Sequence, residues 1–182
     1  MESVGMDLFV AMRRRRMHRA FAPDPVAPET IAKLVWAANR GAAARAGVRH
    51  LVVVDDPLLI GTFRKVCPGF INDAPAAIAI CTDLRVAEQV GGRSGVEEIG
   101  RVDAGTAAAH LTLAAPALGL GCCIVTSWTP SAVQAVLDLP SHVRPEILVA
   151  IGHVAQTPSP AAKAPPLIAH HNRFGTPWKE PA

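Results

Sequence analysis

Tyrosine is absent from the sequence, and aromatic residues make up only 4% of its 182 positions. Proteins that bind single-stranded nucleic acid commonly stack the bases on aromatic side chains. Binding that is independent of sequence requires several phosphates to be neutralised across a surface, yet the formal net charge here is only +3. The low aromatic content and the small net charge argue against a nucleic-acid partner, and only a local run of arginines favours one.

Long uncharged apolar runs are also missing. No apolar stretch reaches the ~18 to 20 residues that a helix needs to span a bilayer. The longest candidate, "LTLAAPALGLGCCIV", is better interpreted as a helix, a turn and a strand. The arginine run is short and a proline-rich segment follows it at once, which argues against a mitochondrial or membrane-targeting signal. We therefore expect no membrane partner.

The cysteines lack the CxxC spacing of redox and zinc motifs. The chain has four, at Cys67, Cys81, Cys122 and Cys123, and the adjacent pair is a poor candidate for a disulfide. No signal peptide precedes them, so we expect reduced thiols and a cytoplasmic location. Cys122 and Cys123 lie in an apolar run, which predicts buried packing.

Several familiar motifs of cofactor binding and catalysis are absent. The stretch "GLGCCI" begins like GxGxxG, but it lacks the third glycine and leads from a helix into a strand, the reverse of the Rossmann order. Neither the P-loop motif GxxxxGK[ST] nor the nucleophile motif GxSxG occurs. The histidines have no spacing typical of metal ligands, so we predict no metal site.

The residues that are present can form one domain with a sizeable core, because half are hydrophobic and 18% are charged. Apolar spacing predicts a short helix within 6–17, ending near the arginines. A second helix is expected from Glu29 or Thr30 to a stop at Gly41 or Gly47. Runs of small and β-branched residues predict buried strands at 50–56 and 74–83, with a helix over 57–67 between them.

The second half of the domain continues the alternation of helices and strands. Gly91, Gly92 and Gly95 indicate a mobile loop or a frayed helix over 84–98. A helix is expected over 102–118, where Asp103 suits the positive end of the helix dipole. A strand follows the "GLG" turn, a helix begins after Thr129, and a last strand covers 146–155. This order favours an α/β or α+β domain over residues 1–155.

The remaining residues, 156–182, contain six prolines and form a C-terminal extension. Such a tail is either disordered or laid across another surface. Its apolar residues favour docking onto a partner subunit.

The segment "MRRRRMHRAF" concentrates five arginines in eight positions. Successive helical residues point about 100° apart, so these arginines cannot all face one groove. One or two of them can still reach a single phosphate, which a guanidinium grips through two parallel hydrogen bonds. Arg19, three residues after Arg16, can close on the same ligand. A solvated helix end remains the alternative interpretation.

The stretch "RRRRMHRAFAPDPVAPETIAKLVWAA" resembles the opening of the FMN-dependent nitroreductase family. Arg15 and Arg16 take the paired basic positions, Met17 the usual serine, and Arg19 the third basic position. The family's central helix and the strand that follows it are similar to "VDAGTAAAHLTLAAPALGLGCCIVTSW". The pattern LxLPxxxxPxxLxxIGxP, found near the end of family members, is similar to "VQAVLDLPSHVRPEILVAIGHVA". "HHNRFG" resembles the C-terminal basic motif, with Arg173 at the position that reaches the FMN phosphate.

The resemblance implies an α+β fold with a central, mostly antiparallel sheet flanked by helices. It also implies a homodimer with exchanged C-terminal segments and FMN in clefts at the interface. FMN takes hydride from NAD(P)H and passes electrons to a small organic acceptor such as a nitro, quinone or enone compound, so no catalytic side chain is expected. By the same resemblance, the phosphate is held by Arg15, Arg16, Arg19 and Arg173, and the backbone of Ile124, Val125 and Thr126 faces the ring.

One stretch departs from the family pattern. Where the family carries Pro-Ser, then Asn, then Gln-Pro-Trp against the flavin ring, this chain has "RGAAARAGVRH". Ala42 stands for the serine, Arg45 for the asparagine, Gly47 for the glutamine and Arg49 for the tryptophan. Arg45 can donate to the N1/C2 carbonyl side of the flavin. Alternatively, the chain is a non-catalytic or weakly flavin-binding relative that acts as a binding or storage protein.

Overall fold

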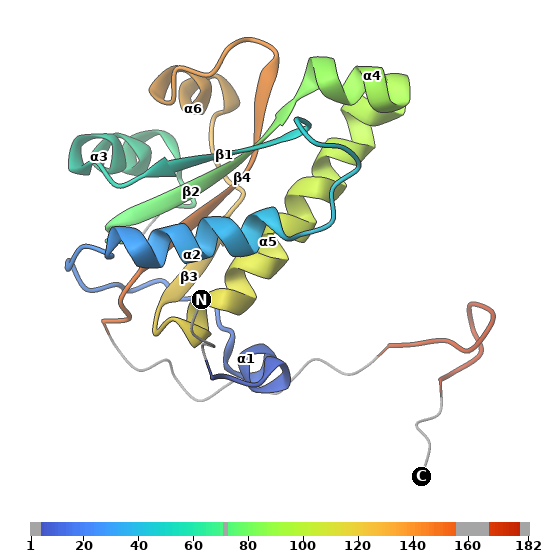
Figure 1. The fold of residues 1–182 in the computed structure, drawn as a ribbon, viewed down its shortest axis with the longest axis horizontal. Helices are drawn as coiled ribbons and strands as arrows, with labels where there is room; N and C mark the ends of the chain where they lie inside the picture. The colour runs from blue at the N-terminus through green and yellow to red at the C-terminus, as the bar shows by residue number, and fades with distance from the viewer. Residues whose placement is uncertain (1–4, 71–72, 156–167, 179–182) are drawn as a thin grey trace.

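A four-stranded antiparallel sheet forms the centre of the protein, whose computed structural model describes residues 5–70, 73–155 and 168–178. The strand order is β1-β2-β4-β3, with β1 at Arg49–Val54, β2 at Ala76–Asp83, β4 at Val143–Gly152 and β3 at Gly121–Val125 (Figure 1). All three strand pairs are antiparallel. The α+β class and the antiparallel sheet expected from the sequence are confirmed.

Helices cover both faces of the sheet. Helices α2 (Pro28–Asn39) and α5 (Gly100–Ala117) pack on one face, and α3 (Pro57–Val66) and α6 (Pro130–Val136) pack on the other. Successive residues of a strand point to opposite faces. Accordingly, Ile78 and Ile80 of β2 pack on the side of α5, whereas Ala79 and Cys81 pack on the side of α3. Among the described residues, no helix is both long and apolar enough to cross a membrane.

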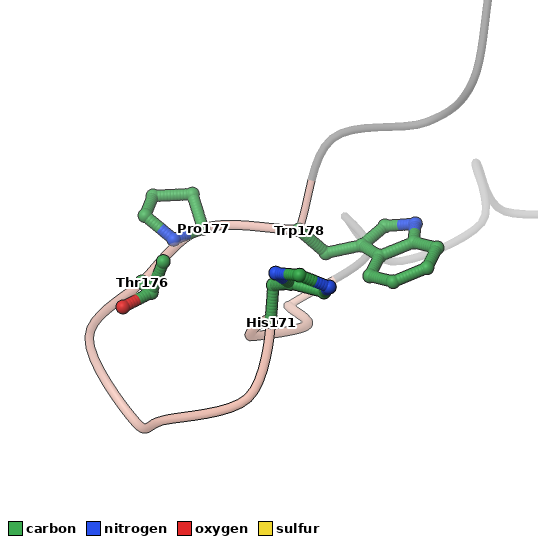
Figure 2. Close-up of a pocket in the computed structure, with 4 residues that line it drawn as sticks. All are labelled: His171, Thr176, Pro177 and Trp178. Carbon is green, nitrogen blue, oxygen red and sulfur yellow. The ribbon is translucent and has the colours of Figure 1, made fainter.

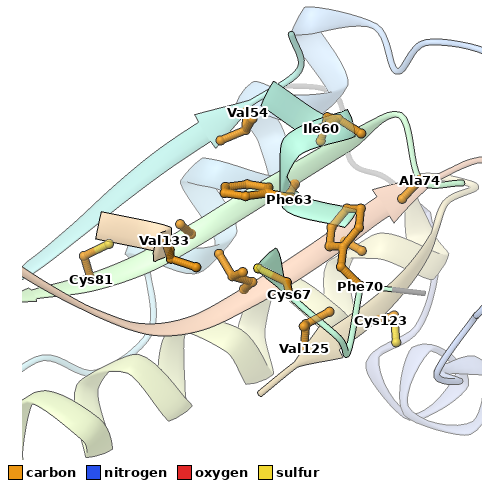
Figure 3. Packing of buried hydrophobic residues seen from close by; sticks show 14 of the residues in the cluster. Val54, Ile60, Phe63, Cys67, Phe70, Ala74, Cys81, Cys123, Val125 and Val133 are labelled. Atoms are coloured by element: carbon orange, nitrogen blue, oxygen red, sulfur yellow. The ribbon is translucent and has the colours of Figure 1, made fainter. Parts of the chain in front are cut away.

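The two halves of the core differ in the size of their side chains. On the α3 side, the rings of Phe63 and Phe70 lie 6.1 Å apart and pack with Ile60 and Val133 (Figure 3). On the α5 side, the helix contributes mainly alanines: Ala104, Ala107, Ala108 and Ala115. Small side chains let α5 lie close to the sheet and to α2.

The expected start of the second helix is wrong by one or two residues. Helix α2 begins at Pro28 rather than at Glu29 or Thr30, because proline is well suited to the first helical position. It ends at Asn39 with Arg40 as its C-cap, so the expected stop at Gly41 is confirmed. Gly41 also allows close packing, since a Cβ there would lie 2.9 Å from the backbone of α5 at Thr106 and Ala107.

The segment 84–98, expected as a mobile loop or a frayed helix, folds as α4 (Leu84–Ser94) followed by a π-helix, η1 (Gly95–Ile99), and non-helical backbone at Gly91 and Gly92 interrupts α4. Asp83 caps α4 by accepting hydrogen bonds from the N–H groups of Arg85 and Val86. The glycines have structural roles: Gly92 turns the chain with φ = +55°, and Gly95 lets η1 lie directly against the Ala87 carbonyl. Glycines that indicate flexibility in the sequence thus allow a tight helical turn.

The described part of the C-terminal extension, residues 168–178, forms a small turn of its own. Its backbone hydrogen bonds stay within the segment, for example from Trp178 N–H to Ala169 O at 2.9 Å. Figure 1 shows this turn apart from the sheet. The rest of the predicted extension, residues 156–167 and 179–182, lies outside the described residues, and its docking onto a partner stays a prediction.

Candidate functional site

The arginine run lies along the outer edge of β3. Helix α1 (Leu8–Arg14) is capped by Asp7, and the chain becomes extended immediately after it. Met17 forms a parallel bridge with Cys122, and the N–H of His18 donates to the Cys122 carbonyl at 2.9 Å. Residues 15–19 therefore run beside β3, which contains Ile124 and Val125 and ends directly before Thr126.

The five arginines do not share one role. Arg13 and Arg14 are exposed in the last turn of α1. The Arg16 guanidinium donates from Nη1 to the carbonyls of Arg13 and Arg15, at 2.6 and 2.9 Å, and so closes the end of the helix. Within the described parts of the chain, Arg15 and Arg19 form no ion pair with a carboxylate. Their donors remain available to an anionic ligand.

The charges of Arg15 and Arg19 act on the two cysteines of β3. Burial raises the pKa of the Cys122 thiol to about 12, and the positive charge of Arg15 opposes that rise. Burial likewise raises the pKa of Cys123, and Arg19 opposes it. Both cysteines are buried, as predicted. The two arginines can act on these thiols because residues 15–19 run beside β3, where Met17 pairs with Cys122.

His18 belongs to the same segment but contributes no charge at neutral pH. Burial lowers its pKa, and the neighbouring positive charge of Arg16 lowers it further. Its ring packs on Gly121, where a Cβ would lie 2.9 Å from Cγ of His18. Arginines alone therefore provide the positive charge on this edge.

The end of β3 offers backbone rather than reactive side chains. Ile124 is half-buried, Val125 is buried and Thr126 is exposed where the strand ends. Ile124 and Val125 follow Cys123 on the same strand, and Thr126 comes directly after it. The structure thus brings together two predicted groups, the phosphate arginines of the N-terminal segment and the strand expected to face the ring.

The loop that departs from the family pattern, residues 40–48, is firmly anchored. Ala42 and Arg45 have exposed side chains, and Gly47 has φ = +89°, a left-handed conformation that favours glycine. The Arg49 guanidinium donates to four carbonyls at 3.0 to 3.2 Å, those of Asn39, Gly41, Ala42 and Asp103. Arg49 therefore ties the loop to α5 at the position where the family carries tryptophan.

Helix α5 supplies two further anchors that sequence reasoning missed. Asp103 is only 5% exposed, and its carboxylate accepts the N–H of Ala44 at 3.0 and 3.2 Å. The Thr106 hydroxyl lies 2.6 Å from the Ala42 carbonyl, which accepts its hydrogen bond. From the sequence, the only role expected for Asp103 is at the positive end of the helix dipole. An acidic residue in a mostly apolar helix could have predicted a second role, because a carboxylate that becomes buried there requires hydrogen-bond donors.

The arginine edge and the anchored loop lie at opposite ends of the sheet (Figure 1). Arg49 of β1 pairs with Thr82 of β2. Cys122 of β3 pairs with Ile151 of β4, and Ile151 in turn pairs with Ala76 at the other end of β2. The distance along β2 from residue 76 to residue 82 is about 20 Å at ~3.3 Å per residue. One chain therefore brings its predicted phosphate arginines to β3 but not to the 40–48 loop, whose residues were also predicted for the ring.

Arg173 is also separate from the arginine edge in the single chain. It is exposed in the turn of residues 168–178, beside Asn172 and Gly175, which have φ = 61° and 89°. In the same turn, the rings of His171 and Trp178 lie 5.7 Å apart beside an open hollow of about 350 Å³ (Figure 2). The structure thus does not bring Arg173 to Arg15 and Arg19.

An apolar groove of about 440 Å³ runs between α1 and the C-terminal half of α5. Large apolar side chains are exposed on these helices and on α2, including Phe9 at 65%, Val102 at 63% and Trp36 at 52%. Exposed apolar surface of this kind is typical of a protein interface. The groove is lined by Met6, Leu8, Ala11, Met12, His110, Leu113, Ala114 and Ala117.

Comparison with known proteins agrees with this fold. The profile of the nitroreductase family matches residues 45–153. A Methanothermobacter thermautotrophicus protein, provisionally named NADH dehydrogenase/NAD(P)H nitroreductase, is 29% identical over 84% of this chain and 80% of its own length. The FMN reductase [NAD(P)H] of Bacillus subtilis is 25% identical over 91% of this chain and 73% of its own. A solved nitroreductase family protein of Streptococcus pneumoniae superposes with a TM-score of 0.75 at 22% identity, over 87% of this chain and 96% of that one.

Proposed function

The chain belongs to the nitroreductase family, and we propose that it is an FMN-dependent oxidoreductase that passes electrons from NAD(P)H to a small organic acceptor. The names of its relatives support an oxidoreductase that uses NAD(P)H and flavin. The observation that carries the proposal is the pair Arg15 and Arg19, which lie along β3 without a carboxylate partner among the described residues.

The arginine edge fits the phosphate end of FMN. Arg15 and Arg19 have planar guanidinium groups that pair with no carboxylate in the described residues, and such groups suit bidentate binding of a phosphate. Arg16 contributes less, since it donates to helix carbonyls, and Met17 offers no hydroxyl. When bound, FMN supplies the hydride and electron-transfer chemistry. The backbone of Ile124, Val125 and Thr126 would lie against it.

The 40–48 loop fits the ring end in a different way from the family pattern. It has no amide side chain after Asn39, and its Gly41 and Ala42 carbonyls already accept hydrogen bonds from Arg49. We assign Arg45 as the side chain that donates to the N1/C2 carbonyl side of the flavin. A fixed positive charge there stabilises negative charge on the reduced ring.

The proposal includes a homodimer in which each flavin site uses two copies of the chain. The ribityl chain between ring and phosphate spans roughly 9 Å when extended, given single bonds of ~1.5 Å. The arginine edge and the loop of one chain are about 20 Å apart along β2. A twofold axis would bring the loop of one copy to the arginine edge of the other. The exposed apolar residues of α1 and α5 would be covered in such an interface, and Arg173 would reach the phosphate through an exchanged C-terminal segment.

The proposed location is the cytoplasm. All four cysteines are buried and unpaired, and reduced thiols are usual in that compartment. The acceptor is proposed as a class only, namely nitro, quinone or enone compounds, because the site shows no group that selects among them.

A second candidate function is a non-catalytic flavin-binding or storage protein. The observation that favours it is the loss of the family's Ser, Asn and Gln side chains at Ala42, Arg45 and Gly47. Without those amide contacts, a protein can bind the cofactor weakly and still keep the fold.

Flavin binding and reduction distinguish these candidates. We expect the purified protein, incubated with FMN and desalted, to retain absorbance near ~450 nm that NADH or NADPH bleaches under anaerobic conditions. Adding a quinone or nitro compound should then restore the colour. Retained FMN that neither nucleotide reduces would favour the storage protein. Protein that stays colourless after incubation with FMN contradicts the proposal.

A further inference from the structure

We propose that Arg49 is a positioning residue that holds the 40–48 loop in its flavin-binding conformation before the flavin arrives. This inference rests on the proposed function, because it concerns the loop assigned to the ring end of that site. Arg49 itself does not contact the flavin in this account. It acts through the loop, from the position where the family resemblance leads one to expect tryptophan.

The hydrogen bonds of Arg49 join two segments that are far apart in the sequence. Nη1 donates to the carbonyls of Ala42 and Asp103, both at 3.1 Å. Nη2 donates to the carbonyls of Asn39 and Gly41, at 3.2 and 3.0 Å. A planar guanidinium with five donors can satisfy four acceptors at once, whereas a lysine ammonium cannot match this arrangement. One side chain therefore fixes the start of the loop against α5.

Helix α5 holds the same loop from the other side. The Asp103 carboxylate accepts the Ala44 N–H, and Thr106 Oγ1 donates to the Ala42 carbonyl. Gly41 packs on the α5 backbone at a distance that leaves no room for a Cβ. The loop is thus anchored at positions 41, 42 and 44, while the side chain of Arg45 stays exposed.

The composition of the loop explains why it needs such an anchor. Residues 41–47 consist of two glycines, four alanines and one arginine, so the loop has no large side chain to bury. A free segment of this kind would lose conformational entropy when it binds a ligand. A loop that is already ordered avoids this loss on binding, which raises affinity. Arg49, Asp103 and Thr106 provide that order within the chain.

Two measurements on the full-length protein test the inference, with the variant Arg49→Lys and its matched control Arg101→Lys. Arg101 is exposed on α5, outside the 40–48 loop, and no hydrogen bond or ion pair of its side chain occurs in the described structure. Hydrogen–deuterium exchange of the peptide containing Ala44, without flavin, reports the order of the loop. Fluorescence titration with FMN and with riboflavin, which lacks the phosphate, reports the two ends of the site separately.

We expect Arg49→Lys to accelerate exchange at Ala44 but not in β2. The affinities for FMN and for riboflavin should fall by the same factor, on the order of 10-fold. The visible spectrum of bound FMN should also change. Arg101→Lys should match the wild type in every measurement. Should Arg49→Lys fail to fold, Thr106→Val removes a single hydrogen bond to the loop and is expected to change both readouts in the same direction.

Three results would overturn the inference: unchanged exchange at Ala44, faster exchange with unchanged flavin affinity, or a loss confined to FMN. Failure of the proposed function is recognised separately. In that case the wild-type protein binds neither FMN nor riboflavin, although the peptide containing Ala44 is protected from hydrogen–deuterium exchange. The role assigned to Arg49 is then also wrong.

Discussion

Single residues of the arginine run have distinct surroundings despite their identical chemistry. Arg13 and Arg14 are exposed, Arg16 donates to helix carbonyls, and Arg15 and Arg19 influence the thiols of β3. The sequence indicated that successive arginines point in different directions. Which of them faces the strand could not be predicted, because it depends on where α1 ends and on the bridge between Met17 and Cys122.

A double substitution, Arg15→Ala with Arg19→Ala, tests the assignment of these two residues to the phosphate. We expect FMN affinity to fall about 100-fold or more, since a hydrogen bond to a charged group contributes ~1.5–3 kcal/mol. Riboflavin affinity should stay unchanged, and fluorescence titration measures both. The control is Arg13→Ala with Arg14→Ala, which should leave both affinities intact. An equal loss of riboflavin binding would show that the two arginines do not act on the phosphate.

Among the helices and strands, hydrophobic periodicity predicted nearly all of the elements and their order. It did not predict the full helical course of α4 and η1, where three glycines indicated a loop or a frayed helix and the structure has helix on both sides of a break at Gly91 and Gly92. The reason lies in tertiary contacts: Gly95 is required because η1 packs against the Ala87 carbonyl. A pattern of residue types does not reveal such a close approach of two backbones. The same limit applies to Gly41, which ends α2 as expected but also packs on the backbone of α5.

Substitution of Gly95 tests this packing. Gly95→Ala should lower the free energy of unfolding by about 1–3 kcal/mol, as overpacking in a core does. The matched control is Gly61→Ala in the middle of α3, where a Cβ would meet no atom within 4 Å. Because alanine is the better helix former, this control should raise the free energy of unfolding by about 0.5–1 kcal/mol. Urea denaturation measures both, and a neutral Gly95→Ala would contradict the contact.

At the scale of the whole molecule, the family resemblance predicted the α+β fold and the antiparallel sheet correctly. The resemblance also implied a flavin site at a dimer interface, whereas which of the site residues one chain brings together could not be predicted from the sequence. Strand register places the arginine edge and the loop about 20 Å apart. The anchors of the loop, Arg49 and Asp103, were missed for the same reason, since their partners are distant in the sequence.

Complementation between two defective copies tests the central claim most directly, which is that two chains build each flavin site. One copy carries Arg15→Ala with Arg19→Ala, and the other carries Ala42→Trp, which adds bulk at an exposed position of the loop. Each homodimer is defective at both of its sites. A heterodimer, purified through two different affinity tags, would have one doubly defective site and one unaltered site. We predict that it binds about one FMN per dimer with wild-type affinity and that NAD(P)H reduces this FMN. A heterodimer that binds no more FMN than either homodimer would contradict the account.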